Sequence, residues 1–184
     1  MKHKNINMMI LAALFAALTA VGTVVLTIPV GELSITTQVF FACMAGLLLG
    51  PYWGAASQFV YVALGLAGLP IFAGRVGGLT YVAKPSFGFL PGLILMAFVI
   101  GLLTAKLPWK QLWLRMTVAC VAGLVVLYLV GLPYMYFILE KFTFGEIISI
   151  GCLAYLPYDA IKIVCAVLLA SRLVPLLRRS GLLT

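Results

Sequence analysis

The sequence predicts an all-α integral membrane protein with six transmembrane helices, and three observations support this fold class. Hydrophobic residues make up 65% of the 184 residues and charged residues only 9%, whereas soluble domains carry roughly 25% charged residues. The apolar residues gather into runs close to the ~20 residues that a helix needs to cross a bilayer. Most basic residues fall between those runs, where basic residues set the orientation of membrane spans.

The first expected span covers residues 6–28 and follows Lys2, His3 and Lys4. A basic start before an apolar run also fits a signal peptide. This run is longer than a typical signal-peptide core, and no polar sequence follows a small-residue cleavage site. We therefore expect a retained helix.

The second and third expected spans, residues 36–50 and 52–66, are short, and Pro51 separates them. Proline interrupts a helix because it lacks an N–H group and clashes with the preceding turn. The remaining expected spans are residues 87–105, 113–139 and 157–177, with a Gly/Pro-rich loop over residues 65–85 before them. Six spans of about 20 residues use roughly 120 positions, so residues 1–184 are expected to form one domain.

The positions of the charged residues predict that both termini lie in the cytoplasm. With the N-terminus inside, an even number of spans returns the C-terminus to the same side. Eight of the twelve basic residues then lie inside: Lys2, Lys4, Lys106, Lys110, Arg115, Arg172, Arg178 and Arg179. The outer side carries Arg75, Lys84, Lys141, Glu32, Glu140 and Glu146. This asymmetry follows the positive-inside rule, and five or seven spans would spoil it.

The sequence lacks the motifs that mark several classes of function. The net charge of +8 reflects topology, so nucleic acid is not an expected partner. The four cysteines form no Cys-x-x-Cys pair and His3 is the single histidine, so neither a metal site nor a cofactor is expected. No hydroxyl or thiol nucleophile has a histidine base within the membrane. We therefore expect a protein that is not an enzyme, and one without an ATP-binding motif of its own.

Asp159 and Lys162 are the first candidates for a binding site. Ionisable residues at membrane depth are costly and are functional candidates by default. Their i,i+3 spacing places both on one helix face, and Tyr155 lies one turn before Asp159. An acceptor beside a donor suits a ligand with both N–H and C=O groups. A purely structural ion pair at the membrane interface is the alternative.

The Gly/Pro-rich loop is the second candidate, because irregular backbone near membrane depth is tolerated only where protein or a water-filled cavity surrounds it. Gly77 and Gly78 allow close approaches of the backbone, and Phe72 and Tyr81 supply aromatic surface. Arg75 lies on the outer side and suits a carboxylate. A plain external loop with incidental charges is the alternative.

Two further patterns concern polar and small side chains. Gln38 lies at the outer start of the second span and either reaches a pocket or caps the helix. The first span carries two rows of alanines at helical spacing, which allow close helix packing in lipid. The rows are Ala12, Ala16 and Ala20, and Ala13 and Ala17. They fit packing within the protein or docking on a partner.

The chain resembles the BioY family, the biotin-specific S-components (substrate-capture subunits) of energy-coupling-factor (ECF) transporters of bacteria and archaea. The resemblance covers nearly the whole chain. The resemblance is carried by Leu-Leu-Leu-Gly-Pro over 47–51, Tyr-Val-Ala-Leu-Gly-Leu-Ala-Gly-Leu-Pro-Ile-Phe-Ala-Gly over 61–74, Gly77-Gly78, and Pro-Tyr-Asp-Ala-Ile-Lys over 157–162. One segment departs from the family, which commonly reads Gly-Pro-Thr-Gly-Gly-Tyr where this chain reads Lys-Pro-Ser-Phe-Gly-Phe over 84–89.

The resemblance implies a multi-pass protein of a prokaryotic cell membrane with a biotin pocket near the outer face, closed by the loop after the third helix. It implies that Asp159 and Lys162 contact the ureido group. Gln38 and Arg75 are further expected polar contacts. The apolar ring and side chain of biotin are expected to contact Phe72, Tyr81 and Tyr155, beside Gly77 and Gly78.

The resemblance also implies partners. These are a transmembrane coupling subunit, reached through the alanine rows of the first span, and two ATP-binding subunits. An S-component for a different vitamin remains an alternative. Another is a stand-alone, ion-coupled transporter that uses the Asp159–Lys162 pair as its relay.

Overall fold

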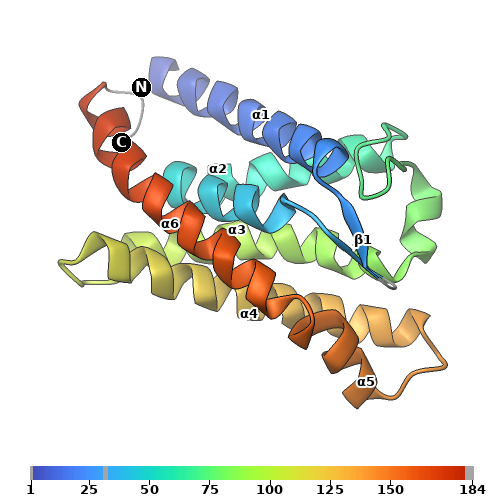
Figure 1. Ribbon diagram of the computed structural model, residues 1–184. Coiled ribbons are helices and arrows are strands. Elements are labelled where there is room, and N and C mark those ends of the chain that lie inside the picture. The colour runs from blue at the N-terminus through green and yellow to red at the C-terminus, as the bar shows by residue number, and fades with distance from the viewer. Residues whose placement is uncertain (1, 31–32, 181–184) are drawn as a thin grey trace.

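The computed structural model describes residues 2–30 and 33–180, which are almost entirely helical (Figure 1). The helices are α1 (Lys2–Val25), α2 (Gln38–Leu66), α3 (Phe89–Lys106), α4 (Leu112–Ile138), α5 (Phe144–Ile148) and α6 (Leu156–Arg179). A π-helical turn, Ser149–Leu153, joins α5 to α6, and two 3₁₀ turns, Leu79–Ala83 and Pro85–Gly88, precede α3. Glu32, expected on the outer side, lies outside the described residues.

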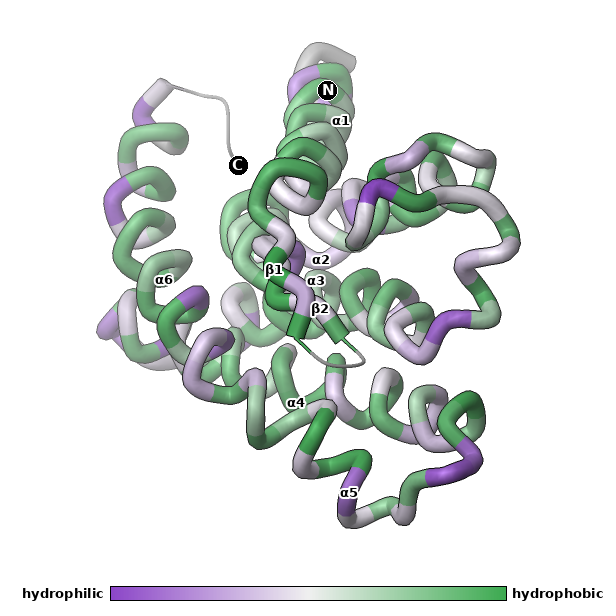
Figure 2. Tube along the Cα trace, turned by 45° about the vertical axis from the view of Figure 1, so that its right-hand side comes forward, coloured by the Kyte–Doolittle hydropathy of each residue, from purple (hydrophilic) through white to green (hydrophobic). Residues whose placement is uncertain are grey.

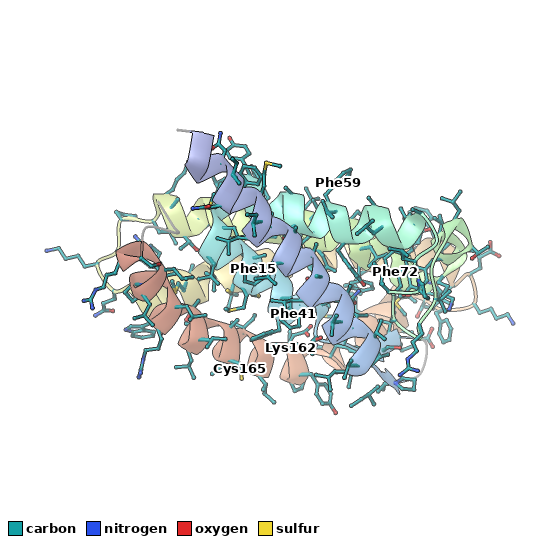
Figure 3. All side chains as sticks on the ribbon, turned by 90° about the horizontal axis from the view of Figure 1, so that it is seen from above. Phe15, Phe41, Phe59, Phe72, Lys162 and Cys165 are labelled. Carbon is teal, nitrogen blue, oxygen red and sulfur yellow. The ribbon has the colours of Figure 1, made fainter. Side chains whose placement is uncertain are left out.

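Five helical segments are long and apolar enough to cross a membrane, and hydrophobic residues run along all of them (Figure 2). They are Asn5–Val25, Gln38–Leu66, Pro85–Lys106, Leu112–Ile138 and Phe144–Leu177. Phe59 and Cys165 point away from the bundle (Figure 3), and both are exposed. Apolar exposure of this kind fits a lipid surrounding, so the chain is a multi-pass membrane protein.

The segment after α1 differs from the expectation. The first span was expected to reach residue 28, but α1 ends at Val25. Pro29 disfavours helix at the residue before it. Instead, β1 (Ile28–Val30) pairs with β2 (Leu33–Ile35) in an antiparallel hairpin between α1 and α2.

Helix α2 reverses direction at Gly50, where the backbone is not helical (φ 77°, ψ −172°), and Pro51 follows directly. In one straight helix, residues 38 and 61 would lie about 35 Å apart at ~1.5 Å per residue. The Gln38 side chain nevertheless donates to the Tyr61 hydroxyl over 2.7 Å. Residues 38–50 and 51–66 therefore run antiparallel. The expected second and third spans correspond to these two halves of one folded-back segment.

The bundle has two distinct ends (Figure 1). The start of α1, the turn at Gly50, the connection between α3 and α4, and the end of α6 lie together, and we call this the terminal end. The β-hairpin, the loop over residues 67–88, and α5 lie at the opposite end, which we call the loop end. The polar side chains of the candidate site, described below, lie at the loop end.

Close backbone contacts hold α2 against α3. A Cβ atom placed on Gly101 of α3 would lie 2.3 Å from the carbonyl carbon of Gly50 and 2.4 Å from the nitrogen of Pro51. Small residues permit this kind of approach, on which helix association in lipid depends. The turn at Gly50 is therefore packed directly on α3.

Replacing Gly101 by valine is expected to destabilise the protein by about 3 kcal/mol, because backbone atoms cannot move aside as a flexible side chain can. Gly145→Ala is the control, since a Cβ atom there meets nothing within 4 Å. Thermal unfolding of the purified proteins in detergent, followed by tryptophan fluorescence, compares the two. Equal melting temperatures for Gly101→Val and the unchanged protein would contradict the packing described for this turn.

Candidate binding site

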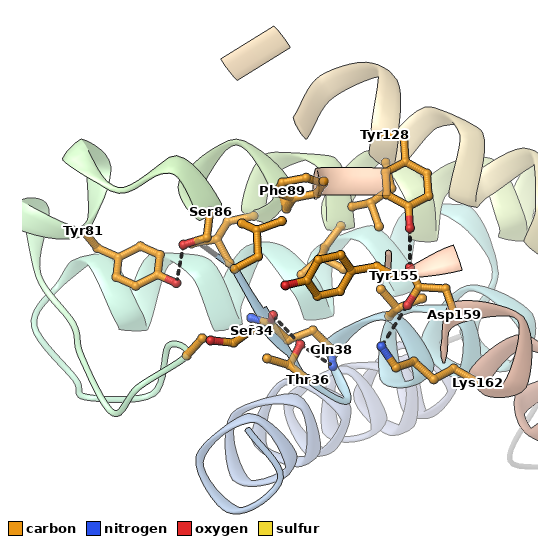
Figure 4. A pocket seen from close by; sticks show the side chains of 17 residues that line it. Ser34, Thr36, Gln38, Tyr81, Ser86, Phe89, Tyr128, Tyr155, Asp159 and Lys162 are labelled. Atoms are coloured by element: carbon orange, nitrogen blue, oxygen red, sulfur yellow. Dashed lines mark hydrogen bonds and ion pairs between the residues drawn. The ribbon is translucent and has the colours of Figure 1, made fainter. Parts of the chain in front are cut away.

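A pocket opens at the loop end, between β2, the loop over residues 67–88, α3, α4 and α6 (Figure 4). Its cavity volume is about 80 Å³. The apolar part of the lining is Leu33, Val39, Phe89, Leu90, Leu93 and Leu127, and the polar part is Ser34, Thr36, Gln38, Tyr81, Ser86, Tyr128, Tyr155, Asp159 and Lys162. Most of the surface exposed inside the pocket is apolar, although more than half of the lining side chains carry a polar group. Apolar surface with convergent polar groups is typical of small-molecule sites.

Asp159 and Lys162 form an ion pair at one end of this pocket. Their side chains meet at 2.8 Å (Oδ1 to Nζ), and the Tyr128 hydroxyl donates to the other carboxylate oxygen, Oδ2, over 2.6 Å. Asp159 is only 4% exposed. It lies in the first turn of α6, where the helix dipole favours a negative charge. Among the described residues this is the single ion pair.

The pair keeps hydrogen-bonding capacity for a ligand. A carboxylate offers about four acceptor positions and an ammonium group three protons. The contacts with Tyr128 and Lys162 use two of the carboxylate positions and one of the protons. A neighbouring donor and acceptor therefore remain side by side at the end of an apolar pocket.

Gln38 lies at the start of α2 in a chain of hydrogen bonds that orients its amide. The Thr36 hydroxyl donates to Gln38 Oε1 over 2.8 Å, and Gln38 Nε2 donates to the Tyr61 hydroxyl. Tyr61 in turn donates to the carbonyl oxygen of Ile71 over 3.1 Å. These hydrogen bonds connect the loop to both halves of α2. Gln38 therefore lines the pocket and also stabilises its wall.

Tyr81 and Ser86 form the opposite end of the pocket in Figure 4. Their hydroxyls lie 2.9 Å apart. Burial raises the pKa of Tyr81 above its ordinary value, so the phenol stays protonated at neutral pH and can donate. The Lys84 ammonium lies 5.3 Å from the centre of the Tyr81 ring, which is within cation–π range. This end therefore offers hydroxyl groups beside a cation.

Tyr155 completes the wall near α6. Its hydroxyl donates to the carbonyl oxygen of Val30 over 2.7 Å, so it joins the helical body to the β-hairpin. Five of the predicted site residues line this one pocket: Tyr155, Tyr81, Gln38, Asp159 and Lys162. Their contact with a ligand stays a prediction.

The structure does not bring Phe72, Gly77 and Gly78 to the pocket. Phe72 is fully buried beneath the loop, with its ring centre 5.7 Å from that of Tyr61 and 4.6 Å from that of Tyr81. A Cβ atom on Gly77 would lie 2.1 Å from the carbonyl oxygen of Leu69. These residues hold the loop against the end of α2 and so support the lining residues indirectly.

Arg75 also lies away from the pocket. It is exposed, and with Gly74 it forms a tight turn in which both residues have positive φ (58° and 80°). Its backbone N–H donates to the carbonyl oxygen of Phe72 over 3.0 Å. Arg75 is not among the described residues that line the pocket, and its contact with a ligand stays a prediction.

The two alanine rows of α1 have different surroundings. Ala12 and Ala16 are 6% and 3% exposed and pack in the core of the bundle, and Ala20 is half-buried against it. Ala13 and Ala17 are exposed. The first row therefore packs inside this protein, whereas the second row faces outward. Docking of either row on a partner stays a prediction.

Sequence reasoning missed Tyr128, which supplies the second hydrogen bond to Asp159. Its signal was weak, because a tyrosine in an apolar span resembles an interfacial aromatic residue. It also missed Ser34, since the β-hairpin was not expected. Phe87, the departure from the family pattern, packs on Tyr134 with ring centres 5.4 Å apart and does not line the pocket.

Comparison with known proteins gives consistent matches over nearly the whole chain. The model of the BioY family matches residues 1–179. A probable biotin transporter of Lysinibacillus sphaericus is 36% identical over 97% of this chain and 92% of its own length. The biotin transporter of Thermotoga maritima is 38% identical over 90% of this chain and 94% of its own.

Structural comparison points to the same group. The crystal structure of the S-component for biotin from an ECF-type ABC transporter superposes with a TM-score of 0.84 at 28% identity. The match covers 94% of this chain and 93% of that one. The two proteins therefore share the arrangement of helices as well as sequence.

Proposed function

The chain belongs to the BioY family, and from this premise we propose that it captures biotin as the substrate-specific subunit of an ECF-type transporter in a prokaryotic cell membrane. It is a transport protein and not an enzyme, because its relatives are named biotin transporters. The single observation that carries the assignment of the site is the Asp159–Lys162 pair, held by Tyr128 at the end of an apolar pocket.

The pair matches the head group of biotin. The ureido ring presents two N–H donors beside a carbonyl acceptor. The free lone pairs of Asp159 accept from an N–H group, while a free proton of Lys162 is donated to the carbonyl oxygen. Hydrogen bonds that involve a charged partner are about twice as strong as neutral ones. A site that pairs every polar atom of the head group also rejects analogues that lack one.

The rest of the ligand fits the remaining lining. Leu93, Leu127 and Phe89 offer apolar surface to the thiophane ring and the methylene chain. The valerate carboxylate then extends toward Tyr81 and Ser86, where hydroxyl donors lie near Lys84. The cavity of about 80 Å³ is smaller than the roughly 300 Å³ and more of typical ligand pockets. We therefore propose that the loop over residues 67–88 and the hairpin move apart when biotin enters.

We propose six membrane crossings, with the two halves of α2 counted separately and both termini in the cytoplasm. The reversal at Gly50 supports this number. The terminal end carries Lys106, Lys110, Arg115 and Arg172, and an excess of basic residues favours the cytoplasmic side. The pocket at the loop end then faces the outside, where a captured vitamin arrives.

The sequence contains no ATP-binding motif, so ATP-driven transport needs partner proteins that hydrolyse ATP. We propose a transmembrane coupling subunit and two ATP-binding subunits as those partners. The exposed residues Ala13 and Ala17 offer a smooth surface on α1 for the coupling subunit, since small residues let helices approach closely in lipid.

Isothermal titration calorimetry with a panel of vitamins tests the proposal. We expect biotin to bind at least about 1,000-fold tighter than thiamine, riboflavin or folate, because only biotin presents the ureido pattern to Asp159 and Lys162. Tighter binding of another vitamin would instead indicate an S-component of different specificity. Ion-dependent biotin flux by this chain alone in liposomes would favour the ion-coupled alternative.

A further inference from the structure

A second cavity, of about 260 Å³, lies at the terminal end of the bundle, opposite the biotin pocket. Its walls come from the turn at Gly50, the end of α3 and the start of α4, with Met8 of α1 and Val174 of α6. Thr104 and Arg115 are the only polar side chains in this lining of described residues. Neither takes part in the proposed capture of biotin.

Arg115 has no counter-charge among the residues that the structure describes. Its Nε atom is buried and has no hydrogen-bond partner among the described residues. The chain has four acidic residues in all. Asp159 is paired in the biotin pocket, Glu140 and Glu146 belong to the loop end, and Glu32 falls between β1 and β2 in the sequence. A partly buried guanidinium without an anion is costly, so an anion from outside the chain would stabilise it.

The Thr104 hydroxyl is a second polar group of this cavity without a hydrogen bond to any described residue. Threonines in helices commonly donate to the carbonyl oxygen one turn earlier, as Thr19 does to Phe15 over 2.8 Å and Thr117 does to Trp113 over 2.9 Å. The Thr104 hydroxyl is buried but makes no hydrogen bond within the described part of the chain. A second donor therefore lines the same cavity as the guanidinium.

The surroundings raise the positive potential at this cavity. Lys106, Lys110, Arg172 and Arg179 are exposed at the terminal end. A guanidinium binds phosphate oxygens through two parallel N–H groups. Basic pockets between membrane helices on the cytoplasmic side bind lipid head groups. The apolar wall formed by residues 47–49 and Val174 suits the glycerol and first methylenes of a lipid better than a free ion.

We infer that this cavity binds a phosphate group, held by Arg115 and Thr104, and that an anionic phospholipid of the adjacent leaflet supplies it. The guanidinium bonds two phosphate oxygens and the Thr104 hydroxyl donates to a third. The site places a lipid contact across α2, α3 and α4, which are the helices that also frame the biotin pocket.

Native mass spectrometry of the purified protein, titrated in detergent with phosphatidylglycerol or phosphatidylcholine, tests this inference. We expect phosphatidylglycerol to remain bound at a concentration at least about tenfold lower than phosphatidylcholine. Arg115→Gln should remove that preference, and Thr104→Val should weaken it about threefold. Arg172→Gln is the matched control, because it removes an exposed basic residue of the same end that does not line the cavity, and it should keep the preference.

Other outcomes decide the source of the phosphate or overturn the site. If inorganic phosphate displaces phosphatidylglycerol at millimolar concentration, the same residues bind a free anion, and the lipid as source is wrong. Equal retention of both lipids, or an equal loss in Arg172→Gln, would show that no specific phosphate site exists. Biotin binding reports folding in every variant. If Arg115→Gln fails to fold, Arg115→Lys and Thr104→Val decide, since both keep the positive charge but remove donors.

Discussion

Replacing Asp159 by asparagine is expected to weaken biotin binding at least about a hundredfold, a change of about 2.8 kcal/mol. The carboxylate accepts from Tyr128 over 2.6 Å and from Lys162 over 2.8 Å, and in the proposed complex it accepts from the ureido ring as well. Asparagine keeps the shape but turns one acceptor oxygen into a donor. It also leaves Lys162 without its counter-charge in a mostly apolar pocket, which costs further binding energy.

Calorimetry on the purified variant measures the loss of affinity, and a thermal melt separates it from a loss of folding. Arg75→Gly is the matched control, because Arg75 is a charged residue of the same end that lies outside the pocket. Glycine also adopts its positive φ of 58° without strain. We expect unchanged affinity in Arg75→Gly. An Asp159→Asn variant that binds biotin as well as the unchanged protein would refute the proposed site.

The sequence predicted the class of protein, and it pointed to Asp159 and Lys162 as the candidate site, for simple physical reasons. A composition of 65% hydrophobic residues has no place in water, and few ionisable residues lie within the apolar runs. Asp159 and Lys162 therefore stood out without any structure. The separation of residues 36–50 from residues 52–66 was also predicted, because proline disfavours the continuation of a helix.

Other features depended on tertiary contacts and were out of reach of the sequence. The two alanine rows of α1 look alike in a helical pattern, yet Ala16 packs in the core and Ala17 is exposed. Which face a lipid-embedded helix buries depends on its neighbours, since both faces are apolar. Arg75 was expected to bind a carboxylate, because it is positively charged and was placed on the outer side of the membrane. Its place in an exposed turn, in which Gly74 and Arg75 both have positive φ, could not be read from residue type.

The difference between the two rows gives the second large prediction, which concerns assembly with the proposed coupling subunit. Ala13→Phe combined with Ala17→Phe should leave folding and biotin affinity unchanged, because both residues are exposed. It should lower ATP-driven biotin uptake by cells at least about tenfold, because bulky side chains prevent close helix approach. Val125→Phe on α4 is the control, a small-to-large change at another exposed position, and it should transport normally.

Ala16→Phe separates docking from packing. Ala16 is 3% exposed, so a phenylalanine there overpacks the contact between α1 and α2 and should destabilise the bundle by about 3 kcal/mol. The loss then shows in the melting temperature and in biotin binding, before any partner is added. If Ala16→Phe folds and binds biotin normally but fails to assemble, the first row faces the coupling subunit and α1 must rotate on docking. If the Ala13/Ala17 variant transports normally, the smooth outer face of α1 has no part in coupling.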